Sequence, residues 1–157
     1  MGIALDLGDL DADDRALARA AHAAATHAYA PYSGYAVGAA LRTRDGSVHA
    51  GCNVENAAYG VALCAEVGAV AAANLAGAGA AVVTIAVTGR LMAAGAAPDG
   101  AVVTPCGRCR QLILEAGHRA RHDIRVLCCN HDLSRVEVFT IAQLLPHDFG
   151  PGNLGLG

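Results

Sequence analysis

The amino-acid sequence predicts an α/β fold in which helices pack on a mixed β-sheet. Three observations support this fold class. The chain has 157 residues, a length that suits one domain with a substantial core. A hairpin pattern at residues 37–54 is followed by segments that alternate between helical and strand-like periodicity, and such alternation is typical of a sheet covered by helices. No internal repeat or domain boundary is apparent, so we expect one domain over residues 1–157.

The first elements are expected to be a helix and a β-hairpin. The helix covers residues 11–28, where Asp11 can cap the N-terminus and apolar residues recur at helical spacing. Two strand-like runs follow at residues 37–43 and 47–54. The Asp-Gly pair at residues 45–46 lies between these runs and predicts a tight turn that joins them.

The rest of the chain is expected to alternate helices with strands. A second helix carries Cys64 and Glu66 in its first turn, and a third follows Pro105, which can occupy a position just before a helix. The remaining elements are strands at residues 82–87, 124–130 and 136–140 and a helical turn at residues 141–145. We therefore expect a sheet of five strands. We expect an exposed connection at residues 90–100 and a flexible tail from about residue 150 to residue 157.

The composition argues against several classes of partner. Hydrophobic residues make up 54% of the chain and charged residues 16%, and with 4% aromatics the core must be built mainly from small side chains. A net charge of −3 gives no electrostatic basis for binding a nucleic acid polymer. No apolar run is long enough to cross a membrane, and the N-terminus lacks the pattern of a signal peptide. We therefore expect a cytoplasmic protein without a membrane partner.

Three cysteines and one glutamate form the most informative pattern. Residues 62–67 (Ala-Leu-Cys-Ala-Glu-Val) supply Cys64 and Glu66. Residues 104–111 (Thr-Pro-Cys-Gly-Arg-Cys-Arg-Gln) supply Cys106 and Cys109, whose two-residue gap lets both sulfurs reach one ion. Structural zinc sites use four protein ligands, whereas catalytic sites leave one position for water. Three cysteines therefore favour a catalytic zinc ion.

The same three cysteines have two alternative interpretations: a structural zinc knuckle or a set of buried thiols. A structural site needs a fourth Cys or His at ligand spacing, and the sequence has none nearby. All three cysteines also fall at expected helix starts, where free N–H groups and the helix dipole stabilise thiolates. A zinc-bound water is acidic enough to supply hydroxide near neutral pH, and Glu66 beside it could transfer the protons.

The spacing Cys64-Ala65-Glu66, followed by Pro-Cys-Gly-Arg-Cys at residues 105–109, matches the signature of the zinc nucleobase deaminases in its all-cysteine form. The chain resembles the cytidine deaminases of the small, homotetrameric type. The runs at residues 31–41, 51–59 and 144–150 also match that family in order, so the resemblance covers nearly the whole chain. It implies a three-layer α/β/α sandwich with a mixed five-stranded sheet and one Zn²⁺ per subunit.

The resemblance also implies an activity: hydrolysis of cytidine and 2′-deoxycytidine to the uridines with release of ammonia, a reaction of pyrimidine salvage. Glu66 would carry protons between the attacking water, N3 of the base and the leaving ammonia. The backbone N–H of Ala65 would bind the carbonyl of the base, and the carbonyl of Thr104 would accept from its amine. Asn53 and Glu55 would bind the ribose hydroxyls, and their alternation about residue 54 places both on one face of a strand.

Two aromatic residues are also implied to contact the substrate. Tyr35 occupies a position where the family usually has Phe packed against the ligand, and its hydroxyl needs a partner. Phe149 matches an aromatic that enters the site of a neighbouring subunit. The resemblance thus implies a homotetramer in which neighbouring subunits complete each site.

Val67 departs from the family pattern, in which Arg often follows the catalytic glutamate and offsets the surplus charge of three thiolates. Zinc with three thiolates carries a net negative charge, which weakens its effect on water. We expect helix N-terminal N–H groups to compensate, with Arg108 or Arg110 as additional candidates.

Two alternative functions follow from the same motifs. A deaminase of a cytosine nucleoside antibiotic such as blasticidin S shares the Pro-Cys-Gly-Arg-Cys-Arg-Gln run, but the Asn53–Glu55 pair favours an unmodified nucleoside. A zinc-stabilised interaction domain is the non-enzymatic alternative, and it would bind zinc without releasing ammonia from cytidine.

Overall fold

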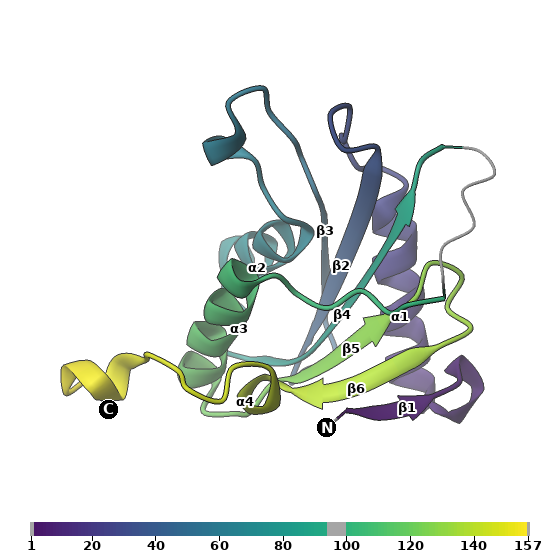
Figure 1. Cartoon of the computed structure of the whole chain (residues 1–157). Helices are drawn as coiled ribbons and strands as arrows, with labels where there is room; N and C mark the ends of the chain where they lie inside the picture. The colour runs from purple at the N-terminus through teal and green to yellow at the C-terminus, as the bar shows by residue number, and fades with distance from the viewer. Residues whose placement is uncertain (1, 94–99, 157) are drawn as a thin grey trace.

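The computed structural model describes residues 2–93 and 100–156, and it has the predicted α/β fold (Figure 1). Six strands form one mixed sheet in the order β1-β6-β5-β4-β2-β3. Their bounds are β1 Ile3–Leu5, β2 Tyr35–Thr43, β3 Val48–Cys52, β4 Val82–Leu91, β5 Arg125–Cys129 and β6 Val136–Thr140. The central pair β4 and β5 is parallel, and every other neighbouring pair is antiparallel.

Helices cover both faces of the sheet and give three layers. The helices are α1 Ala12–Ala25, α2 Ala65–Leu75, α3 Gly107–Ala120 and α4 Ile141–Leu144. One apolar core lies between α1 and the sheet and includes Leu17, Leu127 and Val136. The other lies between the sheet and the helices α2, α3 and α4, with Ile85 and Ile113 at its centre. The three-layer prediction is therefore confirmed.

The prediction of five strands is wrong by one, because β1 was missed. This strand has three residues, which are too few for alternation to be recognised in a sequence. It exists because its backbone pairs with the edge of β6, where Ala4 lies opposite Glu137. The pairing partner is more than a hundred positions away, so nothing local in the sequence indicates the strand.

The connection before α3 and the C-terminal segment, which were predicted to be irregular, both contain some regular structure. The exposed connection predicted at residues 90–100 lies partly outside the described residues, and β4 extends to Leu91. In the predicted tail, Pro151–Leu154 form a short 3₁₀ helix, and the Asn153 side chain accepts from the backbone N–H of Gly150 at 2.8 Å. Within the described part of the chain, no helix is both long and apolar enough to span a membrane.

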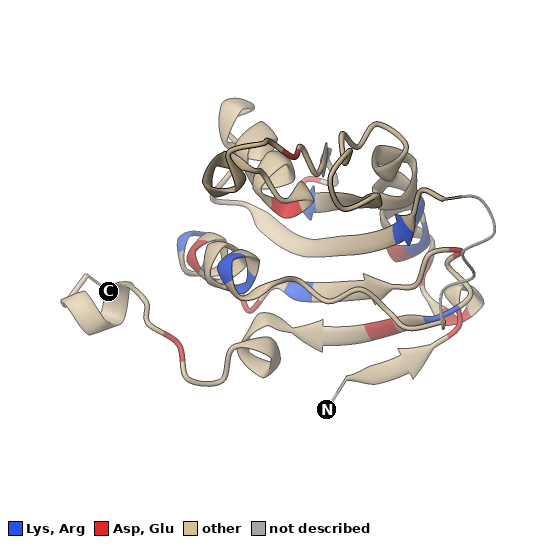
Figure 2. Ribbon diagram, turned by 45° about the horizontal axis from the view of Figure 1, so that its top comes forward, with Lys and Arg blue, Asp and Glu red and all other residues tan. Residues whose placement is uncertain are grey.

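Charged side chains are few and of both signs. Figure 2 shows the basic and acidic residues scattered among the elements, without a basic cluster on the described chain.

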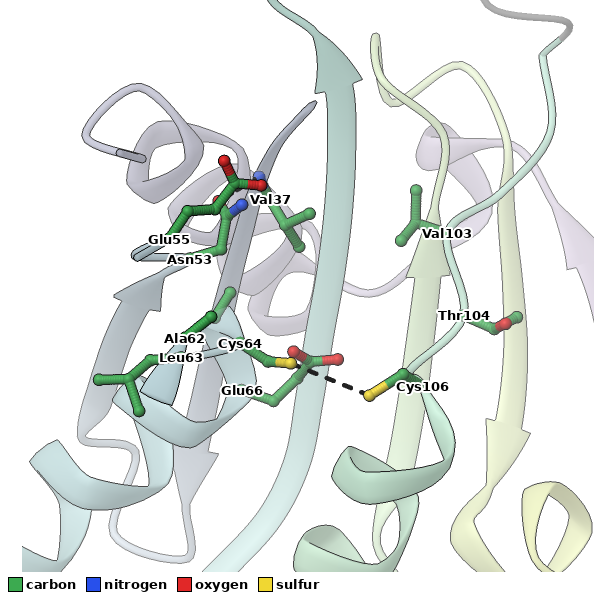
Figure 3. Close-up of a pocket in the computed structure, with 11 residues that line it drawn as sticks. Val37, Asn53, Glu55, Ala62, Leu63, Cys64, Glu66, Val103, Thr104 and Cys106 are labelled. Atoms are coloured by element: carbon green, nitrogen blue, oxygen red, sulfur yellow. Dashed lines mark hydrogen bonds between the residues drawn. The ribbon is translucent and has the colours of Figure 1, made fainter. Parts of the chain in front are cut away.

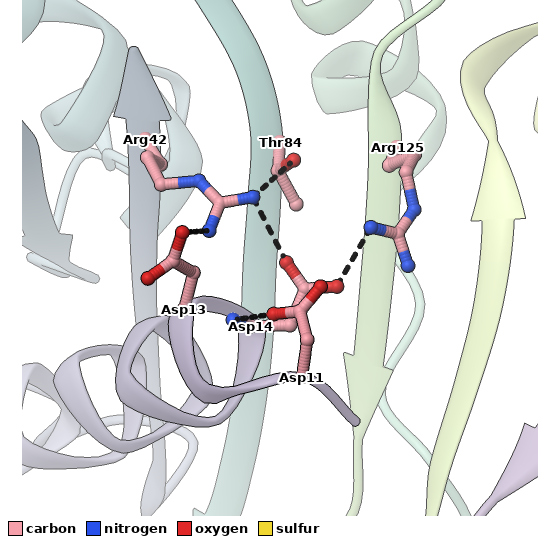
Figure 4. Close-up of polar contacts among 6 residues, drawn as sticks. All are labelled: Asp11, Asp13, Asp14, Arg42, Thr84 and Arg125. Carbon is pink, nitrogen blue, oxygen red and sulfur yellow. Dashed lines mark hydrogen bonds and ion pairs between the residues drawn. The ribbon is translucent and has the colours of Figure 1, made fainter. Parts of the chain in front are cut away.

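One buried ion cluster fixes α1 to the sheet (Figure 4). The Asp14 side chain is 1% exposed and pairs with Arg42 of β2 at 3.1 Å and with Arg125 of β5 at 2.7 Å. Arg42 also pairs with the exposed Asp13 at 3.3 Å and donates to Thr84 of β4 at 3.5 Å. The cluster therefore joins the first turn of α1 to three strands.

Replacing Asp14 with Asn should destabilise the fold by about 3 kcal/mol, because removing one partner of a buried ion pair leaves the other charge uncompensated. The measurement is the free energy of unfolding from urea denaturation. Asp13→Asn is the matched control, since the Asp13 side chain is 80% exposed and its ion pair should contribute no more than about 1 kcal/mol. Equal effects of the two substitutions would contradict the structural role assigned to Asp14.

Candidate active site

Three cysteine thiols meet near the N-termini of α2 and α3, and Figure 3 shows two of them, Cys64 and Cys106. Cys64 caps α2, Cys106 caps α3, and Cys109 is fully buried in the first turn of α3. The three Sγ atoms all lie within 4.8 Å of one another, and those of Cys64 and Cys106 are 3.9 Å apart. The structure therefore brings together the three cysteines that the sequence analysis proposed as metal ligands.

The arrangement of the sulfurs fits a zinc ion. Two thiolates in a tetrahedral zinc site at ~2.3 Å from the metal lie about 3.8 Å apart, close to the separation of Cys64 and Cys106. Among the described residues, no fourth Cys, His, Asp or Glu belongs to the cluster. This donor set suits zinc and leaves one coordination position for a non-protein ligand.

The surroundings raise the pKa of two of the three thiols and lower that of the third. Burial raises the pKa of Cys109, and the Glu66 carboxylate raises it further. Burial also raises the pKa of Cys64. At Cys106, burial also raises the pKa, but hydrogen bonds from the backbone N–H and the thiol of Cys109 and from the thiol of Cys64 together outweigh it, and the pKa falls below its ordinary value. Because metal ligation requires thiolates, binding of a divalent ion would release protons from this cluster.

Glu66 lies in the first turn of α2, beside the cysteines. It is 4% exposed, and its carboxylate points into the space between Cys64 and Cys106 in Figure 3. Burial raises the pKa of Glu66 above its ordinary value. A buried carboxyl group that can hold or give up a proton next to a metal site is the arrangement that general acid–base catalysis requires.

The cluster forms one end of a pocket of about 260 Å³. Six residues proposed from the sequence line the pocket together with Cys64: Asn53, Glu55, Ala65, Glu66, Thr104 and Cys106. Four further residues line the pocket that were not predicted from the sequence: Val37, Ala62, Leu63 and Val103. Strand alternation could have indicated Val37, because it lies on the same face of β2 as Tyr35. Leu63 and Val103 directly precede residues that were proposed.

Asn53 and Glu55 lie at the end of the pocket away from the cysteines. Asn53 Oδ1 accepts from the backbone N–H of Val37 at 2.8 Å, and its Nδ2 donates to the carbonyl of Tyr35 at 2.9 Å. The amide thus holds the first residues of β2 in place. A primary amide has a second N–H and a second lone pair, and no contact between described residues occupies these at Asn53, so they can serve a ligand.

Glu55 is held in its ionised form. Its Oε2 accepts from the backbone N–H groups of Tyr32 at 2.9 Å and Ser33 at 3.2 Å. Hydrogen bonding from the Ser33 side chain, followed by these backbone bonds, lowers the pKa of Glu55. The Glu55 carboxylate lines the pocket, where it can accept from a ligand.

The two aromatic residues proposed from the sequence lie outside the pocket of their own chain. The Tyr35 ring packs on β4 against Gly89, where an added Cβ would lie 2.6 Å from Tyr35 Cε1. Val37, two residues further along β2, lines the pocket. Phe149 is 59% exposed on a segment that projects past α3 (Figure 1).

Neither arginine considered for charge compensation donates to a sulfur among the described contacts. Arg110 donates to the carbonyl of Pro105 at 2.9 Å, to that of Leu144 at 3.0 Å and to Thr104 Oγ1 at 3.4 Å. Arg108 donates to the carbonyl of Ala62 at 3.3 Å. The two side chains therefore stabilise the backbone on either side of the cysteine cluster.

Gly51 allows α2 to approach β3 closely enough to bring its first turn into the pocket. A Cβ at Gly51 would lie 2.5 Å from the carbonyl oxygen of Ala65 and from the amide nitrogen of Ala69. Gly51→Ala should therefore destabilise the fold by about 1–3 kcal/mol, because backbone atoms must move. It should also lower turnover by about 10–100-fold, since a displaced α2 misplaces Cys64 and Glu66.

The measurements for Gly51→Ala are the free energy of unfolding and the rate with cytidine. Gly8→Ala serves as the control, because a Cβ at Gly8 meets no atom within 4 Å. If Gly51→Ala had wild-type activity, the close contact between β3 and α2 would not be what places the first turn of that helix.

The pattern of the site agrees with comparisons to known proteins. The family model for the cytidine and deoxycytidylate deaminase zinc-binding region matches residues 11–122. A cytidine deaminase of Mycobacterium tuberculosis is 46% identical over 144 residues, which cover 92% of this chain and 95% of that relative. A relative from Halalkalibacterium halodurans, also a cytidine deaminase, is 39% identical over 87% of this chain and 94% of its own.

Solved structures show the same fold. The crystal structure of cytidine deaminase from Burkholderia pseudomallei superposes with a TM-score of 0.73 and 42% identity, covering 85% of this chain and 97% of that one. The crystal structure of the Mycobacterium tuberculosis enzyme gives a TM-score of 0.68 and 38% identity, covering 89% and 99%. The resemblance inferred from the motifs is confirmed: this chain belongs to the cytidine and deoxycytidylate deaminase family.

Proposed function

We infer that the protein is a zinc-dependent hydrolase that converts cytidine and 2′-deoxycytidine to uridine and 2′-deoxyuridine with release of ammonia. The observation that carries this function is the cluster of Cys64, Cys106 and Cys109 beside the buried Glu66, at one end of a nucleoside-sized pocket. Relatives at up to 46% identity are cytidine deaminases. The family and the thiol cluster agree on one zinc ion per chain.

Cys64, Cys106 and Cys109 would hold the zinc ion. When bound, zinc acts as a Lewis acid that makes water nucleophilic near neutral pH. Glu66 accepts a proton from the water that attacks C4 of the base and donates a proton to N3. It then transfers a proton to the amino nitrogen, which leaves as ammonia. Water supplies the oxygen of the uridine product, the hydrogen that ends on N3 and the one hydrogen that the amino group gains as it leaves as ammonia.

Two backbone groups are proposed to orient the base. The N–H of Ala65 is one of the free donors at the N-terminus of α2, because an α-helix leaves its first N–H groups without partners. It lies in the pocket wall and can donate to the carbonyl of the base. The carbonyl of Thr104, on the opposite wall, can accept from the amino group.

The sugar end of the pocket favours a nucleoside over a nucleotide. Asn53 and Glu55 offer a donor and acceptors for ribose hydroxyls. The described lining includes no Lys or Arg, and Glu55 is ionised because hydrogen bonds from Ser33 and Tyr32 lower its pKa. A 5′-phosphate near this carboxylate would meet repulsion without a compensating cation. We therefore propose that cytidine and deoxycytidine are substrates and that their monophosphates are not.

We further propose a homotetramer in which Phe149 enters the pocket of a neighbouring subunit, and Tyr35 contacts the ligand from the rim of its own site. The exposed position of Phe149 supports this assembly, as does a group of exposed apolar side chains around the pocket entrance. These are Tyr29, Tyr32, Val54, Tyr59, Val61 and Leu63. The chain is proposed to act in the cytoplasm as one domain over residues 1–157.

The test is to measure ammonia release and loss of cytidine absorbance for purified protein with measured zinc content. Cytidine and deoxycytidine should be turned over, and cytidine monophosphate should be a substrate poorer by at least about 100-fold. Preferential turnover of blasticidin S would point to an antibiotic deaminase instead. Stoichiometric zinc without ammonia from any of these compounds would point to an interaction domain.

A further inference from the structure

The segment after α4 connects the body of the protein to Phe149 without regular secondary structure. Residues 145–150 form no helix or strand, so no backbone ladder fixes their path. The Phe149 side chain is largely exposed and therefore receives little support from its own surroundings. The direction in which its ring projects must depend on contacts that hold the main chain at this position.

Helix α3 supplies these contacts along one edge. Arg110 donates to the carbonyl of Leu144 at 3.0 Å, where the segment begins. Gln111 Nε2 donates to the carbonyl of Phe149 itself at 2.7 Å. Two turns further along α3, His118 Nε2 lies 3.9 Å from Asp148 Oδ2. Positions 111 and 118 are seven residues apart and therefore share a face of the helix.

Close packing at Gly150 places the segment directly against the helix. A Cβ at Gly150 would lie 2.5 Å from Nε2 of His118. The main chain after Phe149 thus passes over the His118 ring at a distance that a larger residue would not allow. The segment is therefore fixed on both sides of the Phe149 carbonyl.

The bond from Gln111 is the strongest of these contacts at Phe149. It is short, and it engages the main chain of the aromatic residue directly. The His118–Asp148 pair is longer, and its two side chains are 39% and 44% exposed, so solvent screens it. Loss of the Gln111 amide would free the Phe149 carbonyl while leaving the bond at Leu144 intact.

We propose that Gln111 is a positioning residue for the deamination reaction: its amide holds the main chain of Phe149 so that the exposed ring is presented in a fixed direction to the pocket of a neighbouring copy. This inference rests on the proposed homo-oligomer. Gln111 does not line the pocket and acts through Phe149. Its loss is expected to affect binding of the substrate, because the Phe149 ring contributes a pocket wall and has no group that transfers protons.

The test first compares three single variants of the zinc-loaded enzyme. Gln111→Leu removes the donor at similar size and should raise KM for cytidine by about 3–10-fold, the range of one neutral hydrogen bond, with kcat nearly unchanged. Gln111→Lys keeps an N–H donor and should restore most of the affinity. Glu115→Leu is the matched control, one turn further along α3 and exposed, and it should have the wild-type KM.

A double-mutant cycle separates positioning from a general effect on stability. In the Phe149→Ala background, Gln111→Leu should add no further increase in KM, because its target is gone. Additive increases would overturn the proposal, and so would a wild-type KM for Gln111→Leu beside a raised KM for Phe149→Ala. Zinc content and the unfolding temperature should be unchanged in Gln111→Leu, and a loss of either would assign the residue a structural role.

Two other results would refute an assumption on which the role of Gln111 depends. A wild-type protein without deaminase activity would refute the proposed function itself. A wild-type protein that deaminates cytidine as a monomer, as measured by light scattering, would refute the contribution of Phe149 to a neighbouring site and with it the role of Gln111.

Discussion

Glu66→Gln is expected to abolish deamination while the zinc content and the fold are preserved. The amide has the size and shape of the carboxyl group, so the first turn of α2 keeps its packing around a side chain that is 4% exposed. It cannot accept the proton of the attacking water or pass protons to the base and the leaving group. One acid–base residue contributes roughly 10²–10⁴-fold, and Glu66 is proposed to serve several transfers, so the loss in kcat should be at least about 10⁴-fold.

The measurement for Glu66→Gln is ammonia release at saturating cytidine, with zinc determined on the same sample. Glu115→Gln applies the same chemical change to an exposed position of α3 and should have wild-type activity. Residual activity of Glu66→Gln above about a tenth of wild type would mean that another group carries the protons. Loss of zinc from this variant would mean that the carboxylate also supports the metal site.

The second large effect is expected for Cys109→Ala, which should remove both bound zinc and activity. Cys109 is fully buried and completes the cluster with Cys64 and Cys106. Two remaining thiols leave the ion with half of a tetrahedral set of ligands, which is one fewer than catalytic zinc sites use. The zinc content should fall from about one per chain to near zero, and turnover should fall by at least about 10⁴-fold.

Cys129→Ala is the control for the loss of a buried thiol. Cys129 is also fully buried, and burial raises its pKa to about 12, but it lies in the core between α1 and the sheet. Its substitution should lower stability modestly and leave the zinc content unchanged. Metal analysis after dialysis against a chelator is the readout. A Cys109→Ala protein that retained one zinc per chain would refute the three-cysteine site.

The grouping of the three cysteines with Glu66 could be predicted because these residues form two pairs with short spacings in the sequence. Cys64 and Glu66 are two residues apart, and a two-residue gap separates Cys106 from Cys109. Both pairs fall at helix starts that local signals indicate, and the structure has these helices beginning at residues 65 and 107. Asn53 and Glu55 were recognisable as a pair because alternate residues of an extended chain share a face.

Contacts that depend on the assembled sheet could not be predicted. The Tyr35 ring packs against Gly89 of the neighbouring strand β4, where the lack of a side chain leaves room for the ring. Gly89 is 54 positions away from Tyr35 in the sequence. The role of Arg110 depends on two backbone carbonyls, those of Pro105 and Leu144, which only the folded chain brings within its reach. A sequence shows that a guanidinium is present but does not show which acceptors surround it.

The short distance between Cys64 and Cys106 has a consequence for handling the protein without its metal. Their sulfurs are 3.9 Å apart, about 2 Å more than a covalent S–S bond. A chelator-treated chain therefore carries a thiol pair that air can oxidise after only a small movement of either side chain. The resulting disulfide would occupy two ligands, so we expect oxidised protein to recover zinc only after a reductant has been added.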